Sequence, residues 1–306
     1  MSEGRHWLST RWGVTLAAGF CTLLWGTAYP VIKLGYEAFG ISGAEPFSLI
    51  LFAGMRFFLA GLISMGIMKL RSGRVAAPSR KAWPKVLKIG LFQVVVQYVF
   101  FSIGTSHTTG VKSAIIGASN VFFTIMIAGL LLHMEKLTWQ KWLGCLIGFA
   151  GVVLINGVKG MGGAWQFQGE GFLFLGAIGA SVATCLVRLY SDGEDPVMLS
   201  TWQFVAGGLA MMGIGLAGGG WVHPGGWMAW AMLGYLGCVS AAAYALWCLL
   251  MKYNSVSKVT VYTFMTPVFS TLFSMLLLEE AQAFGWTGMG ALALVCLGIW
   301  LVNVKK

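Results

Sequence analysis

Long apolar runs alternate with short polar stretches along the whole of this sequence. Each run holds about 20 residues, the length that an α-helix needs to cross a bilayer at about 1.5 Å per residue. The pattern therefore predicts an all-α integral membrane protein with ten transmembrane helices. The expected spans are 12–32, 47–68, 86–105, 110–132, 140–157, 170–189, 197–217, 228–250, 257–278 and 285–303.

The composition agrees with this pattern. Of the 306 residues, 58% are hydrophobic and only 10% are charged, which is more apolar surface than one water-soluble core can bury. The first run is as long as those that follow, so we interpret it as a retained helix and not as a signal peptide. All six cysteines lie inside apolar runs without CxxC spacing, so we expect buried thiols and no disulfide, metal or cofactor.

Basic residues are concentrated in one polar stretch. Seven Lys and Arg residues lie between Lys69 and Lys88, and positively charged loops stay on the cytoplasmic side of a membrane. If this loop is inside, both termini are cytoplasmic. Only Lys33, Lys112 and Lys159 of the 20 basic residues then lie outside, with Arg56 within a span. The predicted location is the inner or plasma membrane, with the lipid bilayer as a partner.

The charges outside this loop do not change the predicted membrane topology. A net charge of +10 would suggest a nucleic-acid partner for a soluble protein. Here the positions of the loops explain the positive charges, and we expect no nucleic acid to bind. The loop with Asp192, Glu194 and Asp195 is assigned inside against its charge, but acidic residues contribute little to orientation.

The second half of the chain matches the first at a constant shift of 147 positions. The shift pairs Trp83 with Trp230 and Trp139 with Trp286, and it keeps one register over the whole half. We interpret this match as an internal duplication. The expected units are a first five-helix repeat at 12–156, a Gly-rich extracytoplasmic connector at 157–169 and a second five-helix repeat at 170–304.

Five spans per repeat is an odd number, so the two repeats must enter the membrane in opposite directions. Shifting the basic loop Lys69–Lys88 by 147 positions gives 216–235, a stretch without Lys or Arg. A loop that is basic in one half and neutral in the other is what inversion requires. The sequence predicts two inverted five-helix repeats around a central cavity, an arrangement common in transporters.

A catalytic function has little support. The ten acidic residues lie in loops or at span ends, the four histidines are scattered, and no HExxH or GxSxG motif occurs. We therefore expect no catalytic residue and no enzyme. A membrane-embedded enzyme or a lipid-handling protein is the alternative from another functional class.

Arg56 is the exceptional residue within the spans, near the middle of the second one. A charge at this depth costs roughly 2.5–3.5 kcal/mol on insertion scales, so it should face the bundle interior or a watery cavity. Arg56 either bonds to backbone carbonyls or contacts a substrate. Its repeat mate, Gln203, keeps the polarity without the charge. Lys112, early in the fourth span, either snorkels to the outer surface or lines the cavity.

The third span carries a polar stripe formed by Gln93, Gln97 and Tyr98. A spacing of four residues places the two amides on one helical face. Their mates at the shift of 147, Ser240 and Tyr244, are also polar and also four residues apart. Such a stripe in both halves either lines a cavity at the repeat interface or forms hydrogen bonds between helices.

Prolines and aromatic residues within the spans complete the candidate cavity. Pro30 and Pro267 cannot donate backbone hydrogen bonds, so they are predicted hinges. Several aromatic residues lie too deep for an interfacial belt and either line the cavity or pack in the core. They are Trp25, Tyr29, Phe101, Trp202, Trp247 and Tyr262.

Small residues mark the fifth span. Gly144, Gly148 and Gly151 are spaced for close helix packing. That packing lies either within one chain or between two subunits, so the oligomeric state stays open between monomer and homodimer.

Four segments resemble the drug/metabolite transporter superfamily, specifically its EamA-type ten-helix members. They are WGTAYPVIK from Trp25, MRFFLAG around Arg56, and the end of each half, as in LLLHMEKLTWQKWLGCLIGFAGVVLI. The sequence departs from the family's pattern at one place. The mate of Pro267 is Asn120 and not a proline, which puts a kink in the fourth span in doubt and makes Asn120 a candidate cavity contact.

This resemblance implies a secondary transporter that exports small metabolites, such as amino acids or related zwitterionic or anionic compounds, by alternating access. Uptake or exchange of organic anions or phosphorylated solutes is the alternative, favoured if Arg56 and Lys112 share the cavity. The absence of an intramembrane carboxylate makes proton-coupled export of cationic drugs less attractive. The predicted substrate contacts are Trp25, Tyr29, Arg56, Gln93, Gln97, Tyr98, Lys112, Asn120, Trp202, Gln203, Tyr244, Tyr262 and Thr266.

Overall fold

The computed structural model describes residues 7–108, 110–157, 164–277 and 286–304. Within these ranges it holds ten helical spans long and apolar enough to cross a membrane, and no β-strand. The predicted all-α membrane fold with ten spans is confirmed, and the span ends agree with the prediction to within a few residues for most spans.

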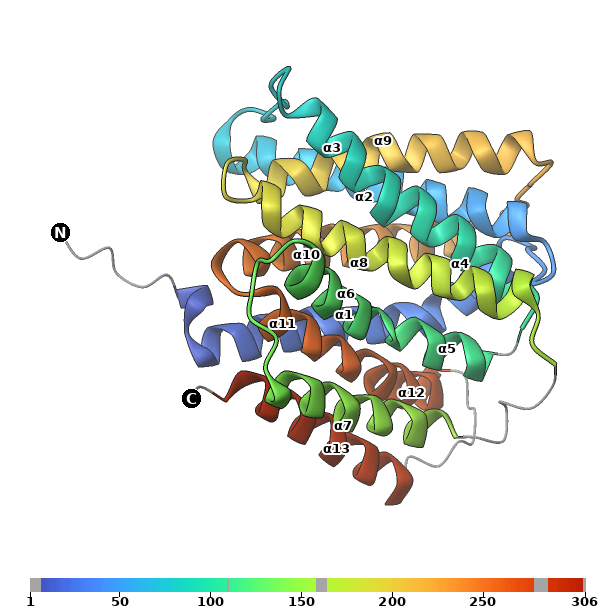
Figure 1. Ribbon diagram of the computed structural model, residues 1–306. Helices are drawn as coiled ribbons and strands as arrows, with labels where there is room; N and C mark the ends of the chain where they lie inside the picture. Colours follow the sequence, from blue (N-terminus) through green and yellow to red (C-terminus); the bar gives the residue numbers. More distant parts are fainter. Residues whose placement is uncertain (1–6, 109, 158–163, 278–285, 305–306) are drawn as a thin grey trace.

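Six spans are single helices, which lie roughly parallel in the bundle (Figure 1). They are α1 (Arg11–Ala38), α2 (Pro46–Ser72), α7 (Trp139–Asn156), α9 (Pro196–Ala217), α10 (Trp227–Tyr253) and α13 (Trp286–Asn303). Local signals set several ends. The Thr10 hydroxyl caps α1 by accepting from Gly13 N at 3.0 Å, and Asp195 caps α9 through Val197 N at 2.8 Å. Gly73, at φ 73°, ends α2 in the left-handed conformation.

The other four spans change helix type along their length. The third is α3 (Trp83–Gly90), the π-helical η2 (Leu91–Val96) and α4 (Gln97–Ser106). The fourth is α5 (Gly110–Ala118), α6 (Asn120–Met126) and the π-helical η3 (Ile127–Leu131). The sixth is the π-helical η5 (Phe167–Gly171) and α8 (Phe172–Tyr190). The ninth is α11 (Val256–Thr260), the 3₁₀ segment η6 (Val261–Phe264) and α12 (Met265–Leu277), and a further 3₁₀ turn, η1 (Trp7–Ser9), precedes α1.

Pro30, Pro267 and the fourth span differ in whether the helix is interrupted there. α1 continues without interruption through Pro30. Pro267 lies in the first turn of α12, directly after the 3₁₀ segment, a position where a missing N–H is tolerated. The fourth span is interrupted at Ser119, between α5 and α6, although it has no proline there. The Ser119 hydroxyl and amide both donate to Ile116 O, which supplies the local turn.

The loops fall at two ends of the bundle as expected. The start of α1, the end of α13 and the basic loop Lys69–Lys88 lie at the same end (Figure 1), here called the basic-loop end. Lys85 forms an ion pair of 2.6 Å with Glu194, which places the acidic loop at this end too. The acidic loop therefore does not contradict the predicted sorting. Which end faces the cytoplasm stays a prediction.

Contacts between the two halves are reciprocal. A Cβ added at Gly61 of α2 would lie 3.2 Å from Thr201 O of α9, and one added at Gly208 of α9 would lie 3.0 Å from Gly54 O of α2. Gly208 follows Gly61 by 147 positions, as Thr201 follows Gly54. Exchange of the two helices therefore reproduces the contact, as a two-fold relation between repeats would. The inverted arrangement itself stays a prediction.

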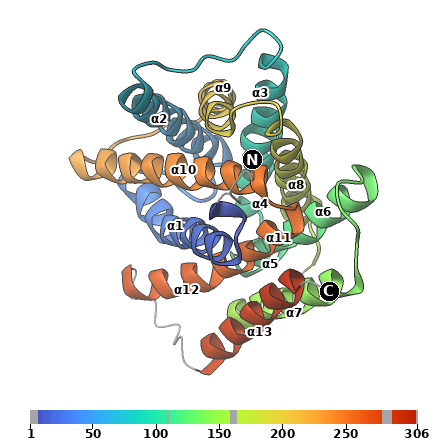
Figure 2. The ribbon, with the colours of Figure 1, turned by 90° about the vertical axis from the view of Figure 1, so that its left-hand side faces the viewer.

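α7 and α13 pack in the same reciprocal way at one edge of the bundle (Figure 2). A Cβ at Gly151 would lie 2.8 Å from Ala291 O, and one at Gly298 would lie 2.5 Å from Gly144 O. These pairs are again related by 147 positions. The small residues of the fifth span thus serve packing within the chain.

The main apolar cluster lies between α1, α10 and the ninth span, where Cys21, Trp247 and Phe264 are buried. All six cysteines are free. Four are buried as expected, but Cys238 and Cys296 are exposed, because they lie on the outward faces of α10 and α13. The prediction of six buried thiols is therefore corrected at these two positions.

Candidate functional site

A cavity lies between the two halves of the chain. Its lining residues come from the first, second, third, fourth, sixth, eighth and ninth spans. The space open to the centres of water molecules is about 180 Å³, well above the roughly 10–15 Å³ that one water needs. This volume suits a small solute.

Nine of the predicted contacts line this cavity. They are Trp25, Tyr29, Arg56, Gln93, Gln97, Tyr98, Asn120, Tyr244 and Thr266. Gln93 lies in the π-helical segment η2 and Gln97 at the start of α4, and both side chains line the cavity. Single-turn π-helical insertions occur frequently at functional sites. The stripe on the third span and its mates Ser240 and Tyr244 are thus brought together.

Arg56 supplies the charge of the site. Its side chain is only 6% exposed, and its guanidinium carbon lies 4.4 Å from the Phe57 ring centroid and 5.2 Å from that of Tyr98. Such contacts stabilise a cation through the ring quadrupole. No described carboxylate lines the cavity or pairs with Arg56. A buried cation without a counter-ion attracts an anionic group into the cavity.

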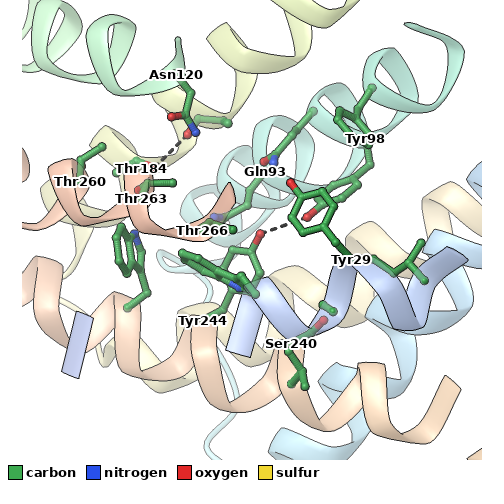
Figure 3. Close-up of a pocket in the computed structure, with 18 of the residues that line it drawn as sticks. Tyr29, Gln93, Tyr98, Asn120, Thr184, Ser240, Tyr244, Thr260, Thr263 and Thr266 are labelled. Carbon is green, nitrogen blue, oxygen red and sulfur yellow. Dashed lines mark hydrogen bonds between the residues drawn. The ribbon is translucent and has the colours of Figure 1, made fainter. Parts of the chain in front are cut away.

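Aromatic rings form one wall of the cavity. The hydroxyls of Tyr98 and Tyr244 are 3.2 Å apart and point toward one another (Figure 3). The Trp25 ring lies 5.2 Å from the Tyr244 centroid and 4.9 Å from that of Trp247. This wall connects α1, α4 and α10, and it presents both apolar faces and hydroxyl groups to a solute.

Several buried polar atoms of the lining have no hydrogen-bond partner among the described residues. They are Trp25 Nε1, Arg56 Nε, Gln93 Oε1, Asn120 Oδ1, Thr260 Oγ1 and Thr266 Oγ1. Leaving one such group unpaired costs about 1–3 kcal/mol. Their concentration in one cavity indicates a site that water or a polar ligand completes.

Comparison with known proteins now identifies the family. A profile of the EamA-like transporter family matches residues 11–157 and again residues 167–304. The chain belongs to this family. Because its members are transporters, this membership argues against an enzyme and supports a membrane transporter.

Individual relatives of this EamA-like transporter cover most of its length. An uncharacterized transporter of Synechocystis sp. is 26% identical over 99% of this chain and 93% of that protein. A WAT1-related chloroplastic protein of Arabidopsis thaliana is 26% identical over 96% of this chain and 70% of its own length. The uncharacterized inner membrane transporter YedA of Escherichia coli is 26% identical over 92% of this chain and 90% of that protein.

Among solved structures, a crystal structure with the same fold also resembles the transporter. Its TM-score is 0.79, it is 20% identical in sequence, and the match covers 95% of this chain and 98% of the other. At this identity the likeness shows the fold alone. It therefore supports the ten-span architecture but carries no information on the solute.

Four predicted contacts of the EamA-like transporter lie away from the cavity. Lys112 Nζ pairs with Glu170 Oε1 at 2.6 Å, with both side chains mostly buried. Trp202 Nε1 donates to Ala76 O at 2.9 Å and so ties the basic loop to α9. Gln203 is fully buried against α3, and the Tyr262 hydroxyl pairs with that of Thr15 at 2.7 Å.

Sequence reasoning missed four threonines of the transporter's cavity: Thr124, Thr184, Thr260 and Thr263. The ninth span holds a detectable signal for part of this set, because Thr260, Thr263 and Thr266 recur every three residues. Side chains at i and i+3 align in a 3₁₀ helix, and η6 is such a segment. The recurrence of threonine every three residues could therefore have indicated that Thr260, Thr263 and Thr266 share one face of the ninth span.

Proposed function

We propose that this transporter exports small zwitterionic or anionic metabolites, such as amino acids and related compounds, by alternating access through the described cavity. The proposal rests on the surroundings of Arg56. Arg56 is buried in the cavity against two aromatic rings without a described counter-ion. A carboxylate of the solute would complete its charge and satisfy Arg56 Nε.

Uptake or exchange of organic anions or phosphorylated solutes is the second candidate. A second cation in the cavity beside Arg56 would favour it. Lys112 does not line the cavity and is neutralised by Glu170, so the site holds one cationic side chain among the described residues. One charge fits a monocarboxylate better than a phosphate, which carries more negative charge.

We further propose that the two five-helix units are inverted repeats joined by an extracytoplasmic connector, with both termini cytoplasmic in the inner or plasma membrane. The reciprocal glycine contacts of α2 with α9 and of α7 with α13 support the repeat. The basic loop Lys69–Lys88 supports the orientation. A relative named as an inner membrane transporter supports the location.

Flux into proteoliposomes tests the transported class. The purified protein is reconstituted and screened with amino acids, organic acids and phosphorylated solutes, and a solute that moves is then used with variants. Arg56→Gln removes the charge and keeps hydrogen-bonding capacity, so we expect transport to fall at least tenfold. Arg56→Lys should retain part of it, because it keeps the charge but loses the planar fork.

Gln203→Leu is the matched control, since it changes the repeat mate of Arg56 on a helix that does not line the cavity. Its transport should equal that of the wild type. If Arg56→Gln folds and moves the solute at the wild-type rate, Arg56 is not a substrate contact. If only phosphorylated solutes move, the second candidate replaces the first.

A further inference from the structure

The cavity differs in accessibility between its two ends. Tyr29 lines it from the half of α1 that lies away from the basic-loop end, and its side chain is 50% exposed. Thr260 lines it from α11, which begins the ninth span at the basic-loop end (Figure 1), and is only 3% exposed. Thr124, near the same end of the fourth span, is 1% exposed. The cavity is therefore accessible toward the end opposite the basic loop and closed toward the basic-loop end.

Glu135 joins the two halves of the chain at the closed end. Its carboxylate accepts from the Ser257 hydroxyl at 2.7 Å and from Ser257 N at 3.1 Å. Lys141 Nζ donates to the same carboxylate at 2.9 Å. Ser257 is buried, and only 7% of the Glu135 side chain is exposed. Hydrogen bonds to a charged group that is shielded from water are stronger than neutral or exposed ones. This interaction between Glu135 and Ser257, here called the Glu135 contact, ties the loop after the fourth span to the start of the ninth.

The turn that presents Glu135 has an unfavourable backbone conformation. His133 has a φ of 50°, and among the residues that the structure describes it is the one non-glycine residue with a positive φ. Only a few per cent of non-glycine residues adopt such a conformation, and they keep it where the surrounding contacts hold it. Met134 N donates to Ala128 O at 2.7 Å on one side of the turn. The Glu135 contact follows directly, so it is one of the interactions that hold this turn in place.

An apolar layer adjoins the Glu135 contact. Ala128 of η3, Cys185 of α8 and Val256 of α11 form one buried cluster, and Met134 packs against it. Cys185 Sγ donates to the backbone carbonyl of Thr124 at 3.6 Å. The layer joins the first half of the chain to the second next to a residue of the cavity lining. A solute that leaves the cavity toward the basic-loop end must part this layer.

The other half of the chain does not repeat the Glu135 contact. The shift of 147 positions relates Glu135 to Gln282 and Ser257 to Gly110. Neither mate carries a charge, and Gly110 has no side-chain donor. Inverted repeats that exchange roles would interconvert the states open at either end. A charged contact that only one end can form stabilises the state in which that end is closed.

We propose that Glu135 is a positioning residue for the transport cycle, whose contact with Ser257 holds the basic-loop end of the cavity closed. The contact must break before a solute passes between the cavity and that end. A neutral side chain at position 135 shifts the equilibrium toward the state open at the basic-loop end. Lys85 and Glu194 also pair across the halves at this end, so part of the closure remains. The inference rests on the proposed function only in treating the cavity as a passage with alternating access.

Labelling of a native thiol tests this proposal. The full-length protein in lipid nanodiscs keeps either Cys185 or Cys248 as its single cysteine, and alanine replaces the other five. Both thiols are fully buried, but Cys248 belongs to a different apolar cluster. Glu135→Gln should raise the rate at which N-ethylmaleimide modifies Cys185 at least about fivefold and leave that of Cys248 unchanged. Glu135→Asp keeps the charge and should stay closer to the wild type.

Ser257→Ala is the second variant, because it removes the hydroxyl donor but leaves Glu135 paired with Lys141. It guards against a Glu135 variant that fails to fold, and it should raise the labelling of Cys185 by a smaller factor. Asp192→Asn is the matched control. Asp192 pairs with Arg188 at 2.7 Å, four residues before it in the same half of the chain, so this pair does not join the halves. Its labelling should equal that of the wild type.

Two results would overturn the proposal. In the first, Glu135→Gln and Ser257→Ala both leave the labelling of Cys185 unchanged. In the second, the labelling of Cys248 rises as much as that of Cys185, which would assign the effect to general destabilisation. Failure of the proposed function is separate, because it appears as absent flux in proteoliposomes while the labelling of Cys185 still responds to Glu135→Gln.

Discussion

The position of the Arg56 guanidinium depends on aromatic side chains. Phe57 and Tyr98 approach it from two helices, α2 and α4, and the Tyr98 hydroxyl is itself held by Tyr244. Phe57 stacks on Phe204 of α9 at 5.2 Å. Each half of the chain therefore helps to position the one cationic side chain that the described part of the cavity contains. The rings should matter to solute affinity even where they do not touch the solute.

Replacing Tyr98 separates the contribution of its ring from that of its hydroxyl. Tyr98→Phe keeps the ring beneath Arg56, whereas Tyr98→Leu removes it. A cation–π contact contributes about 0.5–2 kcal/mol, so Tyr98→Leu should weaken solute binding roughly 2- to 30-fold, and Tyr98→Phe should weaken it less. Solute-induced shifts in Tm give both affinities. Equal losses in the two variants would assign the effect to the hydroxyl and contradict a role for the ring.

A carboxylate forms ion-pair and hydrogen-bond contacts at each end of the fourth span. At the end opposite the basic loop, Glu170 of η5 accepts from Lys112 at 2.6 Å and from Thr108 at 3.0 Å. At the basic-loop end, Glu135 accepts from Lys141 at 2.9 Å and from the Ser257 hydroxyl at 2.7 Å. The interruption at Ser119 lies between these two sets of contacts. The span is thus fixed at both ends and interrupted at the cavity.

Removing one member of the Lys112 and Glu170 pair should destabilise the fold. Both side chains are mostly buried, and an unpaired buried charge costs about 3–5 kcal/mol. Glu170→Gln should therefore lower Tm clearly in detergent solution. The double variant with methionine at both positions should recover most of the loss, because no charge is then left unpaired. A double variant as unstable as the single one would contradict an ion-pair origin.

The helix pair α7 and α13 gives a stability prediction that does not involve charge. A Cβ at Gly298 would lie 2.5 Å from Gly144 O and 2.7 Å from Gly148 N, and backbone atoms cannot move aside as a flexible side chain can. Gly298→Ala should cost about 1–3 kcal/mol through overpacking. Gly234→Ala on α10 is the control, since no atom lies within 4 Å of its added Cβ. Thermal unfolding should show a loss only for Gly298→Ala.

At the scale of the molecule, hydropathy predicted the spans because bilayer thickness fixes their length. It could not predict the rotation of a helix that is apolar on most of its surface, and α9 is such a helix. Trp202 and Gln203 were therefore expected at the cavity, but they lie in packing contacts. Lys112 was considered without its partner, because Glu170 is 58 positions away. Gln93 and Gln97 do line the cavity, and a spacing of four residues could predict this because it places both amides on one helical face.

The orientation of the whole molecule in the membrane is testable with two alanines at opposite ends. Ala77 is exposed in the basic loop, and Ala44 is exposed in the loop between α1 and α2 at the other end. In intact cells, a membrane-impermeant maleimide should label Ala44→Cys but label Ala77→Cys only after lysis. The background is the variant with Cys238 and Cys296 replaced by alanine, because these two native thiols are exposed. Labelling of Ala77→Cys from outside would show that the orientation in the membrane is the opposite of the predicted one. Export would then require the cavity to load from the opposite side, although Arg56 and its aromatic neighbours would form the same site.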